Sequence, residues 1–251
     1  MLEFLMIIIF IGGVIGLVLY VSGLPSSKGT RGEAHVNSFL RANLNSQQNY
    51  ILSDLTLPTT GGTTQIDHIV LSPNGVFVIE TKNMSGWIYG NANQSRWTQV
   101  FRRQKFQFQN PIRQNYKHIK TVQDLLGIEM RQIYNVVVFV GSAEPRTTMP
   151  ENVLWDSRDL LRYIRSKQPI CFYNRDLQSF VEKLKNAALE KSRETSRTHV
   201  ENVRKMLAER QNDKTKCPRC SANMAERTNR KTGEKFLGCS RYPKCKGTRK
   251  I

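Results

Sequence analysis

Apolar residues recur with two different periods along the chain, and together these periods predict both helices and strands. A period near 3.6 residues, typical of helices with one buried face, covers residues 32–44, 110–127 and 156–166. Apolar, β-branched runs predict a hairpin over residues 66–83 and strands within 85–99, 133–141 and 169–173. This mixture predicts an α/β domain over residues 25–172.

Boundary signals are strongest for the helix over residues 110–127. Asn110 can cap its start, Pro111 suits the first helical position, and Gly127 follows its end. Further on, residues 173–213 are charged and carry two weaker apolar stripes. We expect a charged helical linker there.

The N-terminal pattern is different, because residues 4–24 form a run of 21 residues without a charge. As a helix this run would be about 31 Å long, close to one bilayer core. A cleaved signal peptide is the alternative, but no Lys or Arg precedes the run. We expect residues 1–24 to be a transmembrane anchor. Lys28, Arg31 and Arg41 follow it, so the positive-inside rule predicts a single-pass protein of the inner or plasma membrane with its bulk in the cytoplasm.

Composition adds a strong positive charge. The chain has 38 Lys and Arg against 20 Asp and Glu, a formal net charge of +18, which favours nucleic acid or anionic lipid as a partner. The excess is uneven, since residues 214–251 contain 12 of these basic residues, two acidic ones and four of the five cysteines. This tail is therefore predicted to be a separate module.

Three charged residues interrupt the apolar hairpin. Asp67 lies in its first strand, and Glu80 and Lys82 share one face of the second, because side chains alternate across a strand. Charges in strands this apolar cost stability unless they are paired or bound to a metal.

The turn between the two strands decides which residues face each other. If residue 71 opposes residue 76, Asp67 lies opposite Glu80, and we favour this register. A two-residue Asn74-Gly75 loop would instead place Asp67 opposite Lys82. A three-residue loop with a bulge would bring His68 to that position.

Two carboxylates a few ångströms apart repel each other, so one takes a proton unless a cation lies between them. A hard divalent ion, Mg²⁺ or Mn²⁺, fits because it takes oxygen ligands and keeps waters for a substrate. A lysine beside that ion can orient water and offset negative charge during phosphodiester hydrolysis. The alternative is a surface hairpin with an ordinary Glu–Lys pair. Asp67 in register with Glu80 favours the catalytic interpretation.

A third carboxylate belongs to Glu33, in the predicted helix over residues 32–44. At about 100° per residue it lies within roughly 20° of Leu40 and Leu44, so it points towards the apolar side. An acid in a first helical turn is also favoured by the helix dipole, which leaves a purely local role open.

These residues together resemble the nuclease-related domain (NERD) family. The resemblance is carried by Glu33, by QIDHIVLSPNGVFVIETKN at 65–83, by the Trp97 region and by NPIRQN at 110–115. It covers most of residues 28–145. The family is placed in the PD-(D/E)xK nuclease superfamily, which implies a restriction-endonuclease-like core with a mixed sheet flanked by helices.

The resemblance also implies roles for individual residues. Asp67 and Glu80 would bind the metal, and Lys82 would be catalytic. Glu33 would be the helical acid that completes the site, and Gln114 would be the glutamine that superfamily members often place on a following helix. One departure is Ile66, because a proline commonly precedes the aspartate in this superfamily.

The cysteines of the tail form two pairs, CPRC and CSRYPKC, with eighteen residues between them: Cys217, Cys220, Cys239 and Cys245. Such pairs suit a tetrahedral four-thiolate Zn²⁺ site. Two disulfides are the alternative, which a cytoplasmic location disfavours. Because so small a module has little core, the metal would supply much of its folding free energy. Cys171 is predicted to be a buried core thiol without metal partners.

The stretch GEKFLGCSRYPKC resembles the C-terminal zinc ribbons of bacterial type I topoisomerases, over the whole tail, and those ribbons bind single-stranded DNA. Stacking surfaces and phosphate partners lie within it. The residues expected to contact nucleic acid are Arg219, Lys235, Phe236, Arg241, Tyr242 and Lys244. A zinc knob that packs on a protein fits poorly with the charge, and a lipid-binding tail fits poorly with the aromatic residues and cysteines.

The sequence therefore predicts a membrane-anchored, cytoplasmic, metal-dependent nuclease whose zinc ribbon holds DNA. The competing class is a DNA-binding protein in which a degenerate nuclease fold tethers DNA to the membrane without cutting it.

Overall fold

The computed structural model describes residues 27–60, 62–190, 213–220, 222–229 and 232–251, with four isolated positions at 197, 201, 205 and 208. Within these ranges no helix has both the length and the apolar character needed to cross a membrane. The predicted N-terminal span lies outside them, as does most of the second half of the predicted linker.

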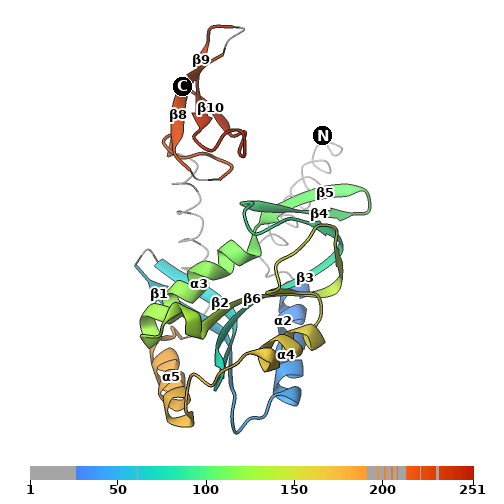
Figure 1. Cartoon of the computed structure of the whole chain (residues 1–251), viewed down its shortest axis with the longest axis vertical. Helices are drawn as coiled ribbons and strands as arrows, with labels where there is room; N and C mark the ends of the chain where they lie inside the picture. The colour runs from blue at the N-terminus through green and yellow to red at the C-terminus, as the bar shows by residue number, and fades with distance from the viewer. Residues whose placement is uncertain are drawn as a thin grey trace, which may run out of the picture.

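A seven-stranded mixed sheet forms the centre of the larger unit (Figure 1). Its strands are β1 (Tyr50–Thr59), β2 (Gly62–Ser72), β3 (Gly75–Tyr89), β4 (Arg96–Phe101), β5 (Gln104–Gln109), β6 (Ile133–Pro145) and β7 (Val153–Leu154). They run antiparallel from β1 to β5, while β6 pairs parallel with β3 and with β7. The expected α/β class with a mixed sheet is therefore confirmed.

Helices cover both faces of this sheet (Figure 1). On one face α2 (Ser27–Asn43) and α4 (Ser157–Ser166) pack with Val70, Phe77 and Ile79. On the other, α3 (Pro111–Leu126) and α5 (Asn174–Ala187) pack with Leu71, Val76 and Val78. A short 3-10 turn, η1 (Met130–Gln132), leads into β6. The apolar stripe at the start of the predicted linker belongs to α5, so the packed unit extends to Ala187.

Two expectations for the strands are wrong. Residues 169–173 form no strand, because Pro169 lacks an amide and the amides of Cys171 and Phe172 both donate to the carbonyl of Pro73, at 2.7 and 3.0 Å. Cys171 is half-buried there rather than buried in the core. Residues 85–89 continue β3 instead of forming a separate short strand, and β5 was not expected.

The C-terminal tail is a small separate sheet, seen at the top of Figure 1. Its order is β10 (Thr248–Lys250), β9 (Lys235–Cys239), β8 (Met224–Thr228), with both pairs antiparallel.

Candidate functional site

A gap in the hydrogen-bond ladder of β3 holds the charged residues. One edge of β3 pairs with β6 from Val76 to Ile88. On the other edge β2 pairs with β3 as far as Ile79, and β4 pairs with it from Trp87. Glu80 and Lys82 therefore lie on a strand segment that is held firmly on one side and open on the other.

The favoured register of the hairpin is confirmed, since Leu71 pairs with Val76. Continued by one step beyond the last pair, this register puts Asp67 opposite Glu80. The ladder does not continue, because the Asp67 carboxylate takes the place of a strand partner and accepts a hydrogen bond of 2.7 Å from the Thr81 amide. This contact draws the aspartate towards the open edge of β3.

Two side chains, from Lys82 and Gln114, meet at Glu80, which is only 3% exposed. Lys82 Nζ lies 2.6 Å from Glu80 Oε1, and Gln114 Nε2 donates to the same oxygen at 2.7 Å. Lys82 also donates to Gln114 Oε1 at 3.2 Å. The structure thus brings together four of the predicted site residues, Asp67, Glu80, Lys82 and Gln114.

Helix α3 carries Gln114 and is fixed at both of its ends as the sequence predicts. Asn110 Oδ1 accepts from the Ile112 amide, Pro111 is the first helical residue, and Gly127 ends the helix with a left-handed conformation. Asn115, fully buried, donates to the carbonyls of Val78 and Val136 at 2.8 and 3.1 Å. This clamp holds the helix against β3 and β6 directly beside the gap.

His118 is a site residue that sequence analysis missed. Its Nε2 lies 3.4 Å from Glu80 Oε2, on the side away from Lys82, and its Nδ1 lies 2.6 Å from the Thr64 hydroxyl. His118 follows Gln114 by four residues, so the two share one face of α3. That spacing was the available signal, but it has meaning only when α3 is known to cover Glu80.

Glu33 approaches the site from the opposite layer. Gly32 allows this, because a Cβ at that position would lie 2.7 Å from Asn83 Cβ and push α2 off the sheet. Burial raises the pKa of Glu33, and the nearby charges of Asp54 and Glu80 raise it further. Among the described residues, the carboxylates of Glu33, Asp67 and Glu80 do not come close enough together to form a cluster of three metal-ligating groups.

The pKa values of the two central carboxylates are shifted in opposite directions. Burial and the charge of Glu80 raise the pKa of Asp67 well above its ordinary value, although the Thr81 amide opposes this. Burial also acts on Glu80, but the neighbouring His118 and Lys82 outweigh it and lower the pKa of that carboxyl. Without a cation between them, Asp67 is therefore the carboxyl of the pair that takes up a proton first as the pH falls.

This donor set fits a hard divalent cation. Asp67 and Glu80 offer carboxylate oxygens in a partly enclosed site, which is the ligand chemistry that Mg²⁺ prefers. Burial and the charge of Glu80 both disfavour the ionised form of Asp67, and a cation bound between the two carboxylates would favour it.

The four cysteines of the tail form the tightest donor cluster. Their sulfur atoms all lie within 4.8 Å of one another, the one group of three or more metal-ligating side chains that converges in this way among the described residues. Cys217 Sγ lies 3.7 Å from Cys245 Sγ, and Cys220 Sγ lies 3.4 Å from Cys239 Sγ. Sulfurs around a tetrahedral Zn²⁺, with bonds of about 2.3 Å, are roughly 3.8 Å apart, so the cluster fits zinc.

Backbone groups shape this cluster as well. The amides of Arg219 and Arg241 each donate to a sulfur, those of Cys217 and Cys239, at 3.4 Å. Gly247 is required, because a Cβ there would lie 2.3 Å from Cys217 Sγ. The spacing of the cysteines therefore works together with a chain that leaves room for four thiolates.

With this geometry in place, residues 28–140 match the family model described as "Nuclease-related domain". This segment of the chain is therefore similar to a nuclease-related domain. Residues 214–251 match the model described as "Topoisomerase DNA binding C4 zinc finger". Both resemblances expected from the motifs are confirmed.

Individual relatives agree with these assignments. The chain is 50% identical to an uncharacterized protein of Bacillus anthracis over 104 residues, which are 41% of this chain and 49% of that protein. It is 50% identical over 30 residues to DNA topoisomerase 1 of Pyrococcus horikoshii, which is 12% of this chain and 4% of the topoisomerase. The match thus spans about half of one relative and a small part of the other. No solved structure matches the chain.

The residues expected to contact nucleic acid lie on the outside of the ribbon. Arg219, Arg241 and Lys244 are exposed, and Tyr242 is 59% exposed. Phe236 is half-buried, and Lys235 pairs with Glu226 at 2.8 Å. Tyr242 is the aromatic surface most open to a base, and Arg227 lies 5.5 Å from the centre of its ring.

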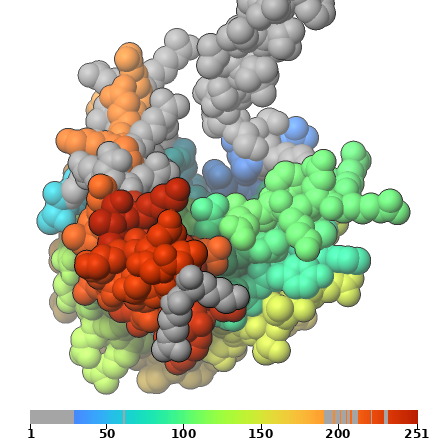
Figure 2. All heavy atoms as spheres, turned by 90° about the horizontal axis from the view of Figure 1, so that it is seen from above, coloured from blue at the N-terminus to red at the C-terminus, as the bar shows by residue number. Residues whose placement is uncertain are grey.

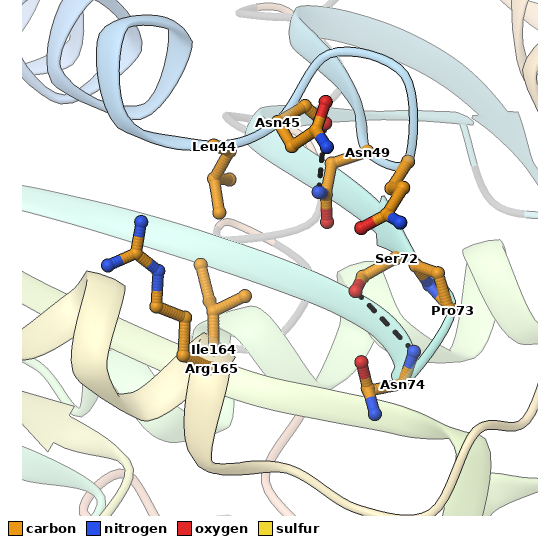
Figure 3. Close-up of a pocket in the computed structure, with 9 residues that line it drawn as sticks. Leu44, Asn45, Asn49, Ser72, Pro73, Asn74, Ile164 and Arg165 are labelled. Carbon is orange, nitrogen blue, oxygen red and sulfur yellow. Dashed lines mark hydrogen bonds between the residues drawn. The ribbon is translucent and has the colours of Figure 1, made fainter.

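A cavity of about 230 Å³ lies elsewhere in the unit built on the seven-stranded sheet. Ser72, Pro73 and Asn74 of the β2–β3 turn line it, together with residues that follow α2 and with Ile164 and Arg165 of α4 (Figure 3). The turn is separated from Glu80 by five residues of β3, roughly 17 Å of extended strand. The cavity is therefore distinct from the carboxylate site.

Proposed function

We propose that this protein is a metal-dependent nuclease that hydrolyses phosphodiester bonds of DNA. The observation that carries the proposal is the meeting of Lys82, Glu80 and Gln114 within 3.2 Å, with Asp67 across the gap in the β3 ladder. Structural pairs of Glu and Lys on a surface do not require a burial of this depth, nor an amide side chain that bonds to both partners. The match to a nuclease-related domain supports the same conclusion.

Each residue of the site has a role that follows from its chemistry. Asp67 and Glu80 would hold Mg²⁺ or Mn²⁺, which supplies an activated water and neutralises charge on the phosphate when it is bound. Lys82, on the open edge of β3, presents its ammonium to a non-bridging phosphate oxygen and offsets the charge that grows there. Gln114 and His118 keep Glu80 in place from α3, and Glu33 adds negative charge from α2.

We propose that the ribbon binds the DNA on which this site acts. Zinc would be held by the four cysteines and would stabilise the fold of the ribbon rather than take part in hydrolysis. The exposed Tyr242 among Arg241 and Lys244 supplies a stacking surface beside phosphate partners. The match to a topoisomerase DNA-binding zinc finger supports this role.

We also propose that residues 1–24 anchor the protein in the membrane with the bulk of the chain in the cytoplasm. The support is the uncharged run of 21 residues, with Lys28 and Arg31 following it. Cell fractionation tests this part: an anchored chain stays in the membrane pellet after an alkaline carbonate wash, and a chain in the supernatant contradicts the anchor.

A second candidate function is DNA tethering without cleavage. One observation favours it: both oxygens of Glu80 already lie close to groups of the protein, Oε1 to Lys82 and Gln114 and Oε2 to His118. In this case the site would be an internal polar network, and the ribbon would bind DNA without a catalytic partner.

A cleavage assay on the purified full chain, retaining its zinc, separates the two functions. Labelled single- and double-stranded DNA would be incubated with Mg²⁺, with Mn²⁺ and with EDTA. We expect metal-dependent products that fall at least about 100-fold in Lys82→Ala, because a group that offsets transition-state charge is lost. Asp67→Asn should abolish cleavage and leave DNA binding intact. Lys185→Ala, at an exposed lysine of α5, is the matched control and should cut normally.

The opposite results are equally informative. Products that persist in Lys82→Ala would show that the hydrolysis does not use this site. Tight binding without products under any metal condition would favour the tether.

A further inference from the structure

The chain around the site has an unusual distribution of charge. Between Glu80 and Asp124 the sequence contains eight Lys and Arg and no Asp or Glu. This stretch contains the open end of β3, the hairpin of β4 and β5, and most of α3. Hence this stretch of the chain is basic and has no acidic neighbours in sequence, a distribution that attracts a polyanion.

The tip of the β4–β5 hairpin concentrates this charge in a turn that does not suit it. Phe101 pairs with Gln104, so the turn consists of two residues, Arg102 and Arg103. Both have positive φ, 49° and 65°. Two-residue turns of this kind normally use Asn-Gly or Asp-Gly, because L-residues with larger side chains are disfavoured in the left-handed region. Two arginines therefore occupy positions where backbone preference selects against them.

The side chains at the tip face solvent. Arg102, Arg103 and Lys105 are exposed, and within the described ranges none of the three makes an ion pair. Phe106 beside them is 48% exposed on a strand that forms the edge of the sheet. Figure 2 shows this bright green segment reaching out from the side of the molecule with its side chains extended.

We propose that the β4–β5 hairpin is a DNA-binding arm that inserts its arginine tip into the major groove of double-stranded DNA. The proposal rests on the proposed function and names its substrate as duplex DNA. β4 joins β3 at Trp87, five residues after Lys82, so a duplex gripped by the arm passes beside the gap.

The shape of the hairpin favours a duplex over other nucleic acids. A two-stranded β-ribbon fits the major groove of B-form DNA, which is about 12 Å wide. The major groove of an RNA duplex is too narrow for it. Single-strand binding would require a row of exposed aromatic residues. Within the hairpin Phe106 is exposed, but Trp97 is fully buried and Phe108 packs against it, so the hairpin itself offers no such row.

Protection of the sheet edge is the competing explanation, since charged residues on an edge strand prevent pairing between copies. It accounts for Lys105. It does not account for two arginines in the turn, because the turn contributes no ladder position and Asn-Gly would close it with less strain.

The test compares DNA binding by the full chain and by two double variants, with EDTA present so that nothing is cleaved. Arg102→Asn/Arg103→Gly removes two charges from the tip and installs the turn sequence that the backbone prefers, so the hairpin should fold at least as well. Arg175→Gln/Lys185→Gln removes the same charge from exposed positions on α5 and is the matched control. The probes are a 24-base-pair DNA duplex, an RNA duplex of the same sequence and single-stranded DNA.

We expect the tip variant to bind duplex DNA about tenfold more weakly, with the slope of log K against log salt reduced by about two, because two positive charges that would lie between the phosphates on either side of the groove are lost. Binding of single-stranded DNA and the behaviour of the α5 control should stay close to the parent. An unchanged affinity for duplex DNA with an unchanged salt slope would overturn the proposal. An equal loss of affinity for single-stranded DNA would overturn it as well.

These results are independent of catalysis. If the parent never cuts DNA but the tip variant loses duplex binding, the proposed nuclease activity is refuted and the proposed DNA-binding hairpin is supported. If the parent cuts DNA and the tip variant binds duplex DNA normally, the nuclease activity is supported and the role of the hairpin in DNA binding is refuted.

Discussion

His68 and Asp67 are neighbours in β2 that face different environments. Asp67 reaches the gap, whereas His68 is 1% exposed and neither ring nitrogen has a hydrogen-bond partner among the described residues. Burial lowers the pKa of His68 to about 4; Arg41 contributes in the same direction, and Asp54 opposes it. The ring is therefore neutral in the folded protein at physiological pH.

This histidine should make the fold sensitive to acid. In the unfolded chain a histidine titrates near pH 6.5, so from about pH 6.5 down to 4 the unfolded state binds the additional proton. Stability is complete above this range and falls within it, by about 2 kcal/mol from this residue at pH 5. We expect His68→Leu to lose less stability than the parent between pH 7 and 5, measured by urea unfolding in EDTA. His35→Gln, at an exposed histidine of α2, should keep the parental pH dependence, and equal slopes in all three proteins would refute the assignment.

Helix α3 brings the site together, and Asn110 fixes the start of this helix. The side-chain amide of this fully buried residue donates to the carbonyls of Asn91, Ala92 and Gln94 at 3.2, 3.2 and 2.7 Å, while its oxygen caps the helix. One side chain thus joins the β3–β4 loop to the helix that carries Gln114.

Two substitutions separate these roles. Asn110→Ser keeps a capping oxygen but loses the bonds to the loop, and Asn110→Ala loses both. We expect the serine variant to be destabilised by about 1–2 kcal/mol and the alanine variant by about 1 kcal/mol more, since loss of a cap costs about that amount. Chemical denaturation measures both. Equal stability of the two variants would mean that the cap contributes nothing here.

Local signals explain why much of α3 and the hairpin was predictable. Asn110, Pro111 and Gly127 mark the helix without any tertiary information, and the alternation of Asp67, Glu80 and Lys82 leaves few registers for a short turn. The motifs then indicated the resemblance that the family model also finds, together with four residues that do meet.

Other features depend on contacts that a linear pattern does not contain. Val76 of β3 pairs with Ile133 of β6 across the whole of β4, β5 and α3, and this pairing decides which edge of β3 stays open. His118 gains its place only when α3 docks over Glu80. The apolar residues 169–173 resembled a strand, but their amides bond to a turn instead.

At the scale of the whole molecule, two units differ in what stabilises them. The sheet-bearing unit has an extensive apolar core on both faces. In the ribbon, by contrast, Cys217 and Cys239 are the only buried apolar side chains within the described residues of the tail. The two units should therefore respond differently to loss of metal.

We expect a zinc chelator to unfold the ribbon and leave the thermal transition of the sheet-bearing unit unchanged. The measurements are zinc content, hydrogen exchange along the chain and calorimetry. Cys220→Ser should lose the bound zinc, while Cys171→Ser, outside the cluster, should retain one zinc per chain. A chain whose ribbon amides stay protected after the metal is removed would show that packing alone holds this module together.

If the turn had only to close a hairpin, Arg102 and Arg103 would be expected to be replaced by residues that suit its backbone conformation. Each L-residue held in the left-handed conformation costs roughly 1–2 kcal/mol, and Asn or Gly at these positions would recover part of it. Selection for stability alone therefore favours losing both arginines. A lineage that keeps them gives up some stability of its fold for the charge at the tip, and the turn becomes a place where selection for binding opposes selection for stability.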